Sequence, residues 1–117
     1  MNQIYQFSLR TSEKNQLINI EKEVEFAIAN AAIKEGSVTV FSPHIKSAII
    51  ANTQIDDCDR ILVEDEEVED TLSHSETFFI SDGKLVMDRF ESLYFFEKEG
   101  YQDRKFFVKI DERKNSR

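Results

Sequence analysis

The sequence has no tryptophan and very little cysteine, proline, glycine or histidine. Its 117 residues include one Cys, one Pro, three Gly and two His. The single cysteine, Cys58, excludes a disulfide within the chain and favours a reducing, cytoplasmic compartment. Scarce glycine and proline argue against a barrel of many very short strands. No apolar run approaches the roughly 20 residues of a membrane span, and the N-terminus lacks a signal-peptide core.

The net charge and the length of the chain exclude further classes of protein. The net charge of −8 at pH 7 disfavours sequence-independent binding to nucleic acid or to anionic membranes, because both need a basic face. Hydrophobic residues make up 40% of the chain, which is enough for a packed core. We therefore expect one globular domain over residues 1–117, with ten phenylalanines filling most of its core.

One stretch, residues 36–52, organises the chain. It holds two apolar runs, Val38–Phe41 and Ala48–Ala51, which are typical of buried strands. Between them Pro43 cannot donate a ladder hydrogen bond, so the first strand should end there. The polar kink presents His44, and Asn52 closes the second strand. Such a kink between buried strands can present a side chain to a ligand.

The remaining pattern predicts further elements by hydrophobic period and turn residues. Asn19 should cap the helix and Gly36 should end it in a left-handed conformation. We expect, in chain order, a strand at Ile4–Leu9, a loop at Thr11–Gln16, a helix at Ile20–Lys34, a short acidic helix within residues 53–71, and strands at Glu76–Ile80, Leu85–Met87, Ser92–Glu97 and Lys105–Ile110.

These elements indicate an α+β domain. Its core should be a mostly antiparallel, two-layer, β-sandwich-like arrangement of about seven strands with one main helix packed against it. Asp82-Gly83 supplies the strongest hairpin signal. Three phenylalanine pairs, at 78–79, 95–96 and 106–107, should place one ring on each face of their strands. Because a chain of this size would struggle to cover both faces, we expect a homo-oligomer.

Several of these positions form a longer pattern. Its residues, in order, are His44, Asn52, Gly83, Lys84, Leu85, Tyr94, Glu97, Gly100 and Arg104. In order and spacing the pattern resembles the YjbQ family, which includes the secondary thiamine-phosphate synthases, and the resemblance runs from Tyr5 to Ile110. It implies a homotrimer and a polar pocket that can hold a metal or an anion, with thiamine phosphate setting the substrate class.

The chain departs from that family at several motif positions. Ile45, Lys46 and Ser47 stand where the family has Thr-Thr-Ala after the histidine, and Thr53 stands where it has Glu. Residues 88–91 replace a Gly-Thr-Trp-Gln segment, and the family's further histidines are missing. The departures favour a degenerate active site. The alternative is a surviving enzyme with a reduced site around His44, acting on a phosphorylated small molecule.

Each candidate residue has a functional and a structural interpretation. His44 suits a general acid or base or a metal ligand, or it is a loop histidine bonded to backbone. Asn52 and Arg104 are candidate ligand-binding residues, and Arg104 could instead pair with Asp103 or Glu99. We expect no cofactor and no tightly bound zinc, because a zinc site needs three or four ligands, although a metal at His44 stays open. His74 is expected at the surface.

Overall fold

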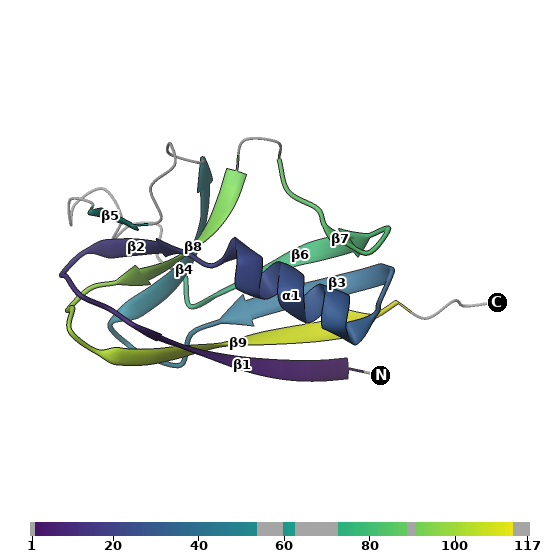
Figure 1. Cartoon of the computed structure of the whole chain (residues 1–117). Coiled ribbons are helices and arrows are strands. Elements are labelled where there is room, and N and C mark those ends of the chain that lie inside the picture. Colours follow the sequence, from purple (N-terminus) through teal and green to yellow (C-terminus); the bar gives the residue numbers. More distant parts are fainter. Residues whose placement is uncertain (1, 54–59, 63–72, 89–90, 114–117) are drawn as a thin grey trace.

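The computed structural model describes residues 2–53, 60–62, 73–88 and 91–113. These ranges hold one helix and nine strands (Figure 1). The elements are β1 (Asn2–Arg10), β2 (Gln16–Asn19), α1 (Glu21–Ala31), β3 (Glu35–Phe41), β4 (Ser47–Thr53), β5 (Arg60–Leu62), β6 (Ser75–Ser81), β7 (Lys84–Leu85), β8 (Glu91–Glu97) and β9 (Asp103–Glu112).

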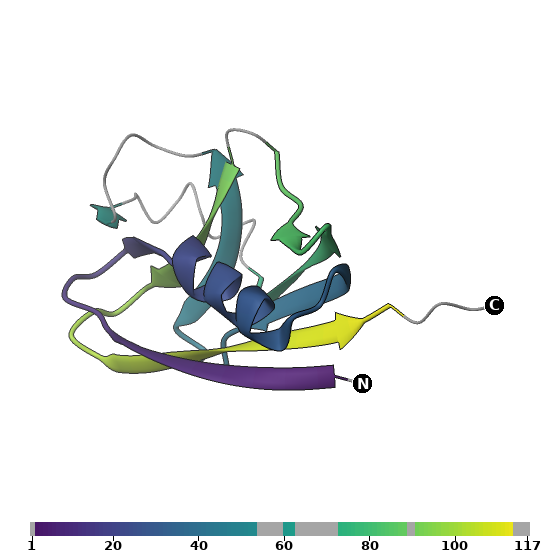
Figure 2. The same cartoon turned by 45° about the vertical axis from the view of Figure 1, so that its right-hand side comes forward.

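The strands form two antiparallel sheets. The five-stranded sheet has the order β1-β9-β3-β6-β7, and the four-stranded sheet has the order β4-β8-β2-β5. Figures 1 and 2 show the sheets meeting at the left, with α1 lying across one side of the five-stranded sheet. The predicted α+β, sandwich-like fold is confirmed. None of the described helices is long and apolar enough to cross a membrane.

Two strands were missed by the sequence patterns. Gln16 was assigned to a loop, yet it begins β2, which pairs with both β5 and β8. A four-residue strand directly before a helix shows no alternation of its own, so its conformation comes from its partners. The expected acidic helix is wrong at Thr53, which ends β4, and at residues 60–62, which form β5. The rest of that segment lies outside the described residues.

The helix is shorter at its C-terminus than predicted. Ala32, with φ 57°, is the left-handed residue that ends α1, so the assignment of Gly36 to that role is wrong. Gly36 lies in β3 instead, where a Cβ would collide with the backbone of Asp111. At the other end the N-cap residue is Ile20, which makes no side-chain capping hydrogen bond, so the assignment of Asn19 to that position is wrong by one residue. Asn19 Oδ1 still accepts the Glu21 N–H at 2.9 Å.

The main core lies between α1 and the inner faces of both sheets. From the helix it takes the buried residues Val24, Ala27 and Ile28. A second, smaller cluster around Leu17, Tyr94 and Phe96 lies on the other face of β8. The four-stranded sheet is therefore buried on both faces at β8.

The two rings of each phenylalanine pair point to opposite faces of their strand, as predicted, but the burial of the outer ring differs from strand to strand. On β8 both rings are buried. On β6 the outer ring, Phe79, is 75% exposed. On β9 Phe106 is buried and Phe107 is half-buried, where it stacks on Phe41 with ring centroids 5.0 Å apart. Among these three pairs, the rings that are not fully covered thus include Phe79 and Phe107 on the outer face of the five-stranded sheet.

Candidate functional site

His44 lies where Pro43 interrupts the pairing of β3 with β9. The ladder ends at Phe41 opposite Phe107, and continuing its register would place Pro43 opposite Lys105. The Lys105 N–H instead donates to His44 Nε2 at 3.1 Å. The imidazole thus replaces the missing strand acceptor and satisfies a backbone donor that would otherwise be unpaired.

Serines at both ends of the loop that carries His44 hold it in place by hydrogen bonds. Ser42 and Ser47 hydrogen-bond to each other through their hydroxyls. Ser47 Oγ also donates to the His44 carbonyl oxygen at 3.1 Å, while the His44 N–H donates to Ser42 Oγ at 3.3 Å. The Ser42 N–H donates to the carbonyl oxygen of His74, whose side chain is exposed as expected. The loop is held by its own polar contacts, so its histidine has a defined position.

The pKa of His44 is lowered from 6.5, chiefly by partial burial and then by the positive charges of Arg104 and Lys105, against an opposing effect of Glu97. The lowered pKa keeps the ring neutral at pH 7. A neutral ring whose Nε2 accepts a hydrogen bond carries its proton on Nδ1.

A buried ion pair lies beside His44. Glu97 is the last residue of β8 and is 0% exposed. Arg104 donates two hydrogen bonds to its carboxylate, from Nε to Oε1 at 2.7 Å and from Nη2 to Oε2 at 2.8 Å. The N–H groups of Glu99 and Gly100 donate to the same carboxylate at 2.8 and 3.0 Å. Although burial opposes it, these donors lower the pKa of Glu97 from 4.5 to about 2.

The alternative of a structural salt bridge for Arg104 is thereby partly confirmed. Glu99, one of the two predicted partners, lies 3.3 Å from Arg104 Nη2, but the main partner is Glu97. The other predicted partner, Asp103, pairs with Arg10 at 2.9 Å instead. The side chain of Arg104 is 10% exposed, and its Nε and Nη2 donate to Glu97 and Glu99 within the chain.

Further buried polar residues gather at the same end of the molecule. Gln16 and Ser47 flank Glu97 on the neighbouring strands β2 and β4, and both are buried. The Gln16 side chain accepts the N–H groups of Ser12 and Glu13 at 2.9 and 3.3 Å. These buried polar side chains can lie close together because each of them has hydrogen-bond partners.

A shallow depression of about 600 Å³ opens over this end. It is lined by Ser8, Leu9, Arg10, His44, Asp103, Arg104 and Lys105. The side chains that carry charge there are mainly cationic, which suits an anion rather than a metal ion. Across the described ranges, no three His, Cys, Asp or Glu side chains are grouped so that they could hold a metal.

Asn52 lies at the opposite end of β4. Ser47 pairs with Glu97 at one end of the strand, and Asn52 pairs with Ser92 near the other. At about 3.3 Å per residue the two ends are roughly 16 Å apart. The fold therefore brings His44 and Arg104 together within one chain and leaves the backbone of Asn52 away from them.

Sequence reasoning missed Glu97 and Gln16 as members of this polar end. Glu97 was part of the family pattern but received no role, because nothing local in the sequence shows that it would be buried. Gln16 gave no signal, since a glutamine in a polar stretch usually faces water.

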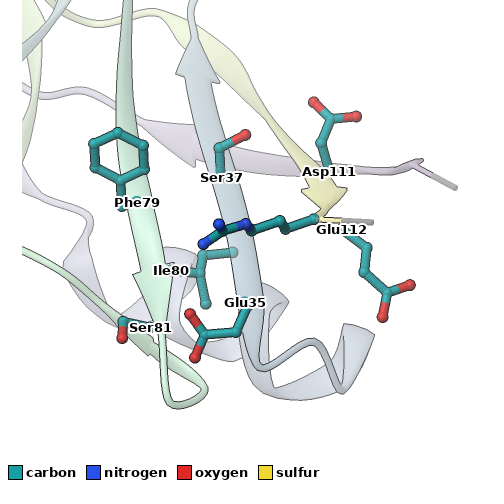
Figure 3. A pocket seen from close by; sticks show the side chains of 9 residues that line it. Glu35, Ser37, Phe79, Ile80, Ser81, Asp111 and Glu112 are labelled. Atoms are coloured by element: carbon teal, nitrogen blue, oxygen red, sulfur yellow. The ribbon is translucent and has the colours of Figure 1, made fainter. Parts of the chain in front are cut away.

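A second hollow of about 550 Å³ lies at the other end of the five-stranded sheet. Figure 3 shows Asp111, Ser37 and Phe79 side by side from three neighbouring strands, with Glu35 and Glu112 near the rim. Glu35 accepts the Asp82 N–H at 3.0 Å. This hollow contains carboxylates and serines but no histidine among its lining residues, so we assign it no acid–base chemistry.

Comparison with known proteins finds relatives that cover most of the chain. The family model described as "UPF0047 protein YjbQ-like" matches residues 5–66. The chain is 22% identical over 133 residues to UPF0047 protein MJ1081 of Methanocaldococcus jannaschii, covering 92% of this chain and 93% of that protein. It is 20% identical over 124 residues to UPF0047 protein YugU of Bacillus subtilis, covering 87% and 94%.

Solved structures show the same fold. An uncharacterised conserved protein of the YjbQ/UPF0047 family from Clostridium acetobutylicum superposes with a TM-score of 0.78 at 26% identity, covering 92% of this chain and 99% of that one. A YbjQ-like protein of unknown function from Sulfolobus solfataricus has a TM-score of 0.78 at 19% identity, covering 97% and 100%. The chain therefore belongs to the YjbQ-like UPF0047 family.

Proposed function

We propose that this chain is a homo-oligomeric member of its family whose active site is degenerate, so that it acts as a binding or structural domain rather than as an enzyme. One observation carries the proposal: the ionisable groups beside His44 are already used in holding the fold together. His44 Nε2 accepts the Lys105 N–H, and Arg104 is paired bidentately with buried Glu97.

General acid–base catalysis needs a group that can gain or lose a proton near the working pH and can reach the substrate. Glu97, with its pKa lowered to about 2, stays ionised and is enclosed by its donors. His44 has lost one of its two ring nitrogens to a backbone contact. Glu97 is therefore not free for proton transfer, and His44 keeps only its protonated Nδ1.

The second candidate function is a thiamine-phosphate synthase-like activity on a phosphorylated small molecule at a reduced site around His44. The cationic lining of the depression, which includes Arg10 and Lys105, favours it, because phosphate groups bind where Arg and Lys converge. Binding of such an anion is compatible with both candidates; only turnover separates them.

For the assembly we propose a homotrimer in the cytoplasm. The exposed Phe79 and the half-buried rings of Phe41 and Phe107 lie on the outer face of the five-stranded sheet. Burying a Phe side chain is worth about 1.5–3 kcal/mol, so a contact between copies through this face would be favourable. The number three comes from the family resemblance, and the compartment from the single cysteine.

A direct assay for thiamine-phosphate formation tests the proposal. We expect no turnover above the enzyme-free background. The matched variants are His44→Ala and His74→Ala, since His74 is the other histidine and its side chain is exposed. Turnover that His44→Ala abolishes and His74→Ala preserves would show that the site is catalytic and that the proposal is wrong.

A further inference from the structure

The strand β1 is an unusually open edge of the five-stranded sheet. It spans Asn2–Arg10, and among the described strands it pairs only with β9, residue for residue along its whole length, without a bulge. Figures 1 and 2 both draw it as the outermost strand. Natural edge strands are usually protected by proline, lysine, a bulge or short length. β1 has none of these protections, and its only charged residue is Arg10.

The hydrogen bonds at the strand end show which backbone groups face outward. The Thr11 N–H donates to the Gln102 carbonyl at 2.9 Å, one step beyond the Arg10–Asp103 pair in the same register. Bonded and non-bonded pairs alternate in an antiparallel ladder. The odd-numbered residues of β1 therefore bond to β9, and the even-numbered residues direct their N–H and C=O groups away from the sheet.

The other side of β9 gives an independent check. The Arg113 N–H donates to the Glu35 carbonyl at 2.9 Å, so the odd-numbered residues of β9 bond to β3 and its even-numbered residues bond to β1. This alternation agrees with the assignment for β1. Within the part of the chain that the structure describes, Ile4, Gln6 and Ser8 thus present backbone donors and acceptors without a strand partner along the open edge.

Exposed apolar side chains lie on both sides of this edge. On the outer face Ile4 is 61% exposed. On the inner face Phe26 of α1 is 59% exposed and stands edge-on over Phe7 of β1, with ring centroids 6.3 Å apart. Asn30, one turn further along α1, donates to the Tyr5 hydroxyl at 3.2 Å. The helix therefore holds Phe26 above the open strand.

We propose that β1 is an interface between two copies of this chain, in which the two β1 strands pair antiparallel about a twofold axis through Gln6. In this register Gln6 faces Gln6 of the second copy and Ile4 faces Ser8 of the second copy. Each even-numbered residue, whose backbone groups point outward, is then opposite an even-numbered residue of the second copy. The outward N–H and C=O groups of the two strands therefore pair with each other. The two five-stranded sheets become one continuous sheet.

The side chains favour a second copy over an unrelated strand. A twofold axis through the seam is perpendicular to the sheet, so both α1 helices lie on the same side and their Phe26 rings approach each other. Tyr5 is then opposite Phe7 of the second copy, an aromatic cross-strand pair. The seam would cover Phe26 and Ile4 together with the open edge.

Charges of opposite sign also approach each other across the seam. The register places Arg10 of the second copy opposite Asn2, whose neighbour on β9 is Asp111. Arg10 and Asp111 both stand on the outer face, since their strands alternate in the same sense. Each already has an exposed partner in its own chain, Asp103 at 2.9 Å from Arg10 and Lys109 at 4.0 Å from Asp111, so the seam adds a contact to these pairs rather than neutralising unpaired charges.

This contact is separate from the proposed trimer contact, which is centred on Phe79, Phe41 and Phe107. If both form, three twofold seams join two trimers, and the particle contains six chains. The seam alone gives two chains, and the outer-face contact alone gives three. The mass of the particle therefore separates the two proposals. A trimer would mean that the seam does not form, and a dimer would mean that the outer-face contact does not form.

The first test is light scattering of the intact protein and two variants. Gln6→Pro removes only an outward N–H, which an edge strand tolerates, whereas Phe79→Ser changes only the outer face. We expect an even multiple of the 13.7 kDa chain mass, halved by Gln6→Pro and left even by Phe79→Ser. An odd multiple for the intact protein, or a mass unchanged in folded Gln6→Pro, would overturn the seam.

The second test is amide hydrogen exchange of the intact protein, which does not depend on a variant that folds. In the seam the N–H groups of Ile4, Gln6 and Ser8 should be protected as strongly as those of Tyr5 and Phe7. They should lose that protection on dilution below the association range, while Tyr5 and Phe7 keep theirs. Fast exchange confined to the even-numbered residues at high concentration would show that no copy pairs there.

Discussion

The strands β6 and β8 have nearly the same sequence plan and very different surroundings. Each has seven residues and a Phe-Phe pair, and each is followed by a turn that contains a glycine with positive φ. On β8 both Phe95 and Phe96 are buried, whereas on β6 Phe79 is 75% exposed. Equal sequence patterns thus gave unequal burial.

The difference comes from what lies on the second face. β8 is bonded on both sides, to β2 and β4, and buried clusters pack on both of its faces. β6 lies beside the two-residue strand β7 near the edge of the other sheet, and its outer face has no covering layer among the described residues. Alternation decides which face a ring takes, and the neighbouring elements decide whether that face is dry.

The turns after the two strands differ in the same way. Behind β8, Gly100 (φ +91°) packs so closely that a Cβ would lie 2.6 Å from the carbonyl carbon of Glu13. Behind β6, Asp82 and Gly83 have φ 54° and 76°, as the predicted hairpin turn requires, and a Cβ on Gly83 would meet nothing within 4 Å. One turn is part of the core and the other is part of the surface.

The largest effect should come from truncating the outward ring of each pair. Phe96→Ala should lower the free energy of unfolding by about 3–5 kcal/mol, because it leaves a cavity in a closed cluster. Phe79→Ala should change it by only about 0.5 kcal/mol in dilute solution. Urea unfolding measures both. Equal losses at low protein concentration would contradict the assignment of the β6 outer face as uncovered within one chain.

A loss for Phe79→Ala that grows with protein concentration would sharpen the comparison. It would show that the outer face of β6 is covered by another copy rather than by the chain itself, because association of the native state adds stability that rises with protein concentration. The loss for Phe96→Ala should not depend on concentration.

The next effect concerns the carboxylates at the two turns. Arg104→Ala should cost about 3 kcal/mol, because it leaves Glu97 buried without its partner. Glu35→Ala removes only an exposed hydrogen bond to the Asp82 N–H and should cost less than about 1 kcal/mol. Urea unfolding at pH 7 compares them, and a loss for Arg104→Ala no larger than that for Glu35→Ala would show that the ion pair contributes little.

The pH dependence of the free energy of unfolding tests the Glu97–Arg104 pair in a second way. The pKa of Glu97 is lowered to about 2 in the fold from an ordinary 4.5, so the unfolded chain binds a proton more readily. The stabilisation is complete above about pH 5 and is lost as the pH falls towards 2. Glu97→Gln should flatten this part of the stability curve. A variant with the same acid sensitivity as the intact protein would assign that sensitivity to other carboxylates.

The smallest difference between the two regions should come from their turn glycines. Gly83→Val must place a β-branched residue at positive φ and should cost about 1 kcal/mol or more. Gly100→Val meets the same backbone strain and also a collision with the segment around Glu13, so it should cost more. Melting temperatures rank the two, and a Gly83→Val melting temperature equal to that of the intact protein would contradict the strained turn.

Much of the fold could be predicted from local patterns. The strand pair around Pro43, the helix beginning after Asn19, and the Asp82-Gly83 hairpin follow from period, capping and turn chemistry, which act within a few residues. The composition also indicated a phenylalanine-rich core, and the order of the expected elements indicated the α+β fold. The position of Gly36 was misjudged because a glycine after a helix and a glycine under a neighbouring strand look alike in a sequence.

Tertiary structure alone decided how the candidate site is built. Pairing across β3 and β9 placed the Lys105 N–H against His44, and the approach of β8 to β9 buried Glu97 against Arg104. The same pairing left Asn52 at the far end of β4. These contacts join residues up to 61 positions apart, and neither their burial nor their partners leaves a local mark, because desolvation depends on which strands close over a group.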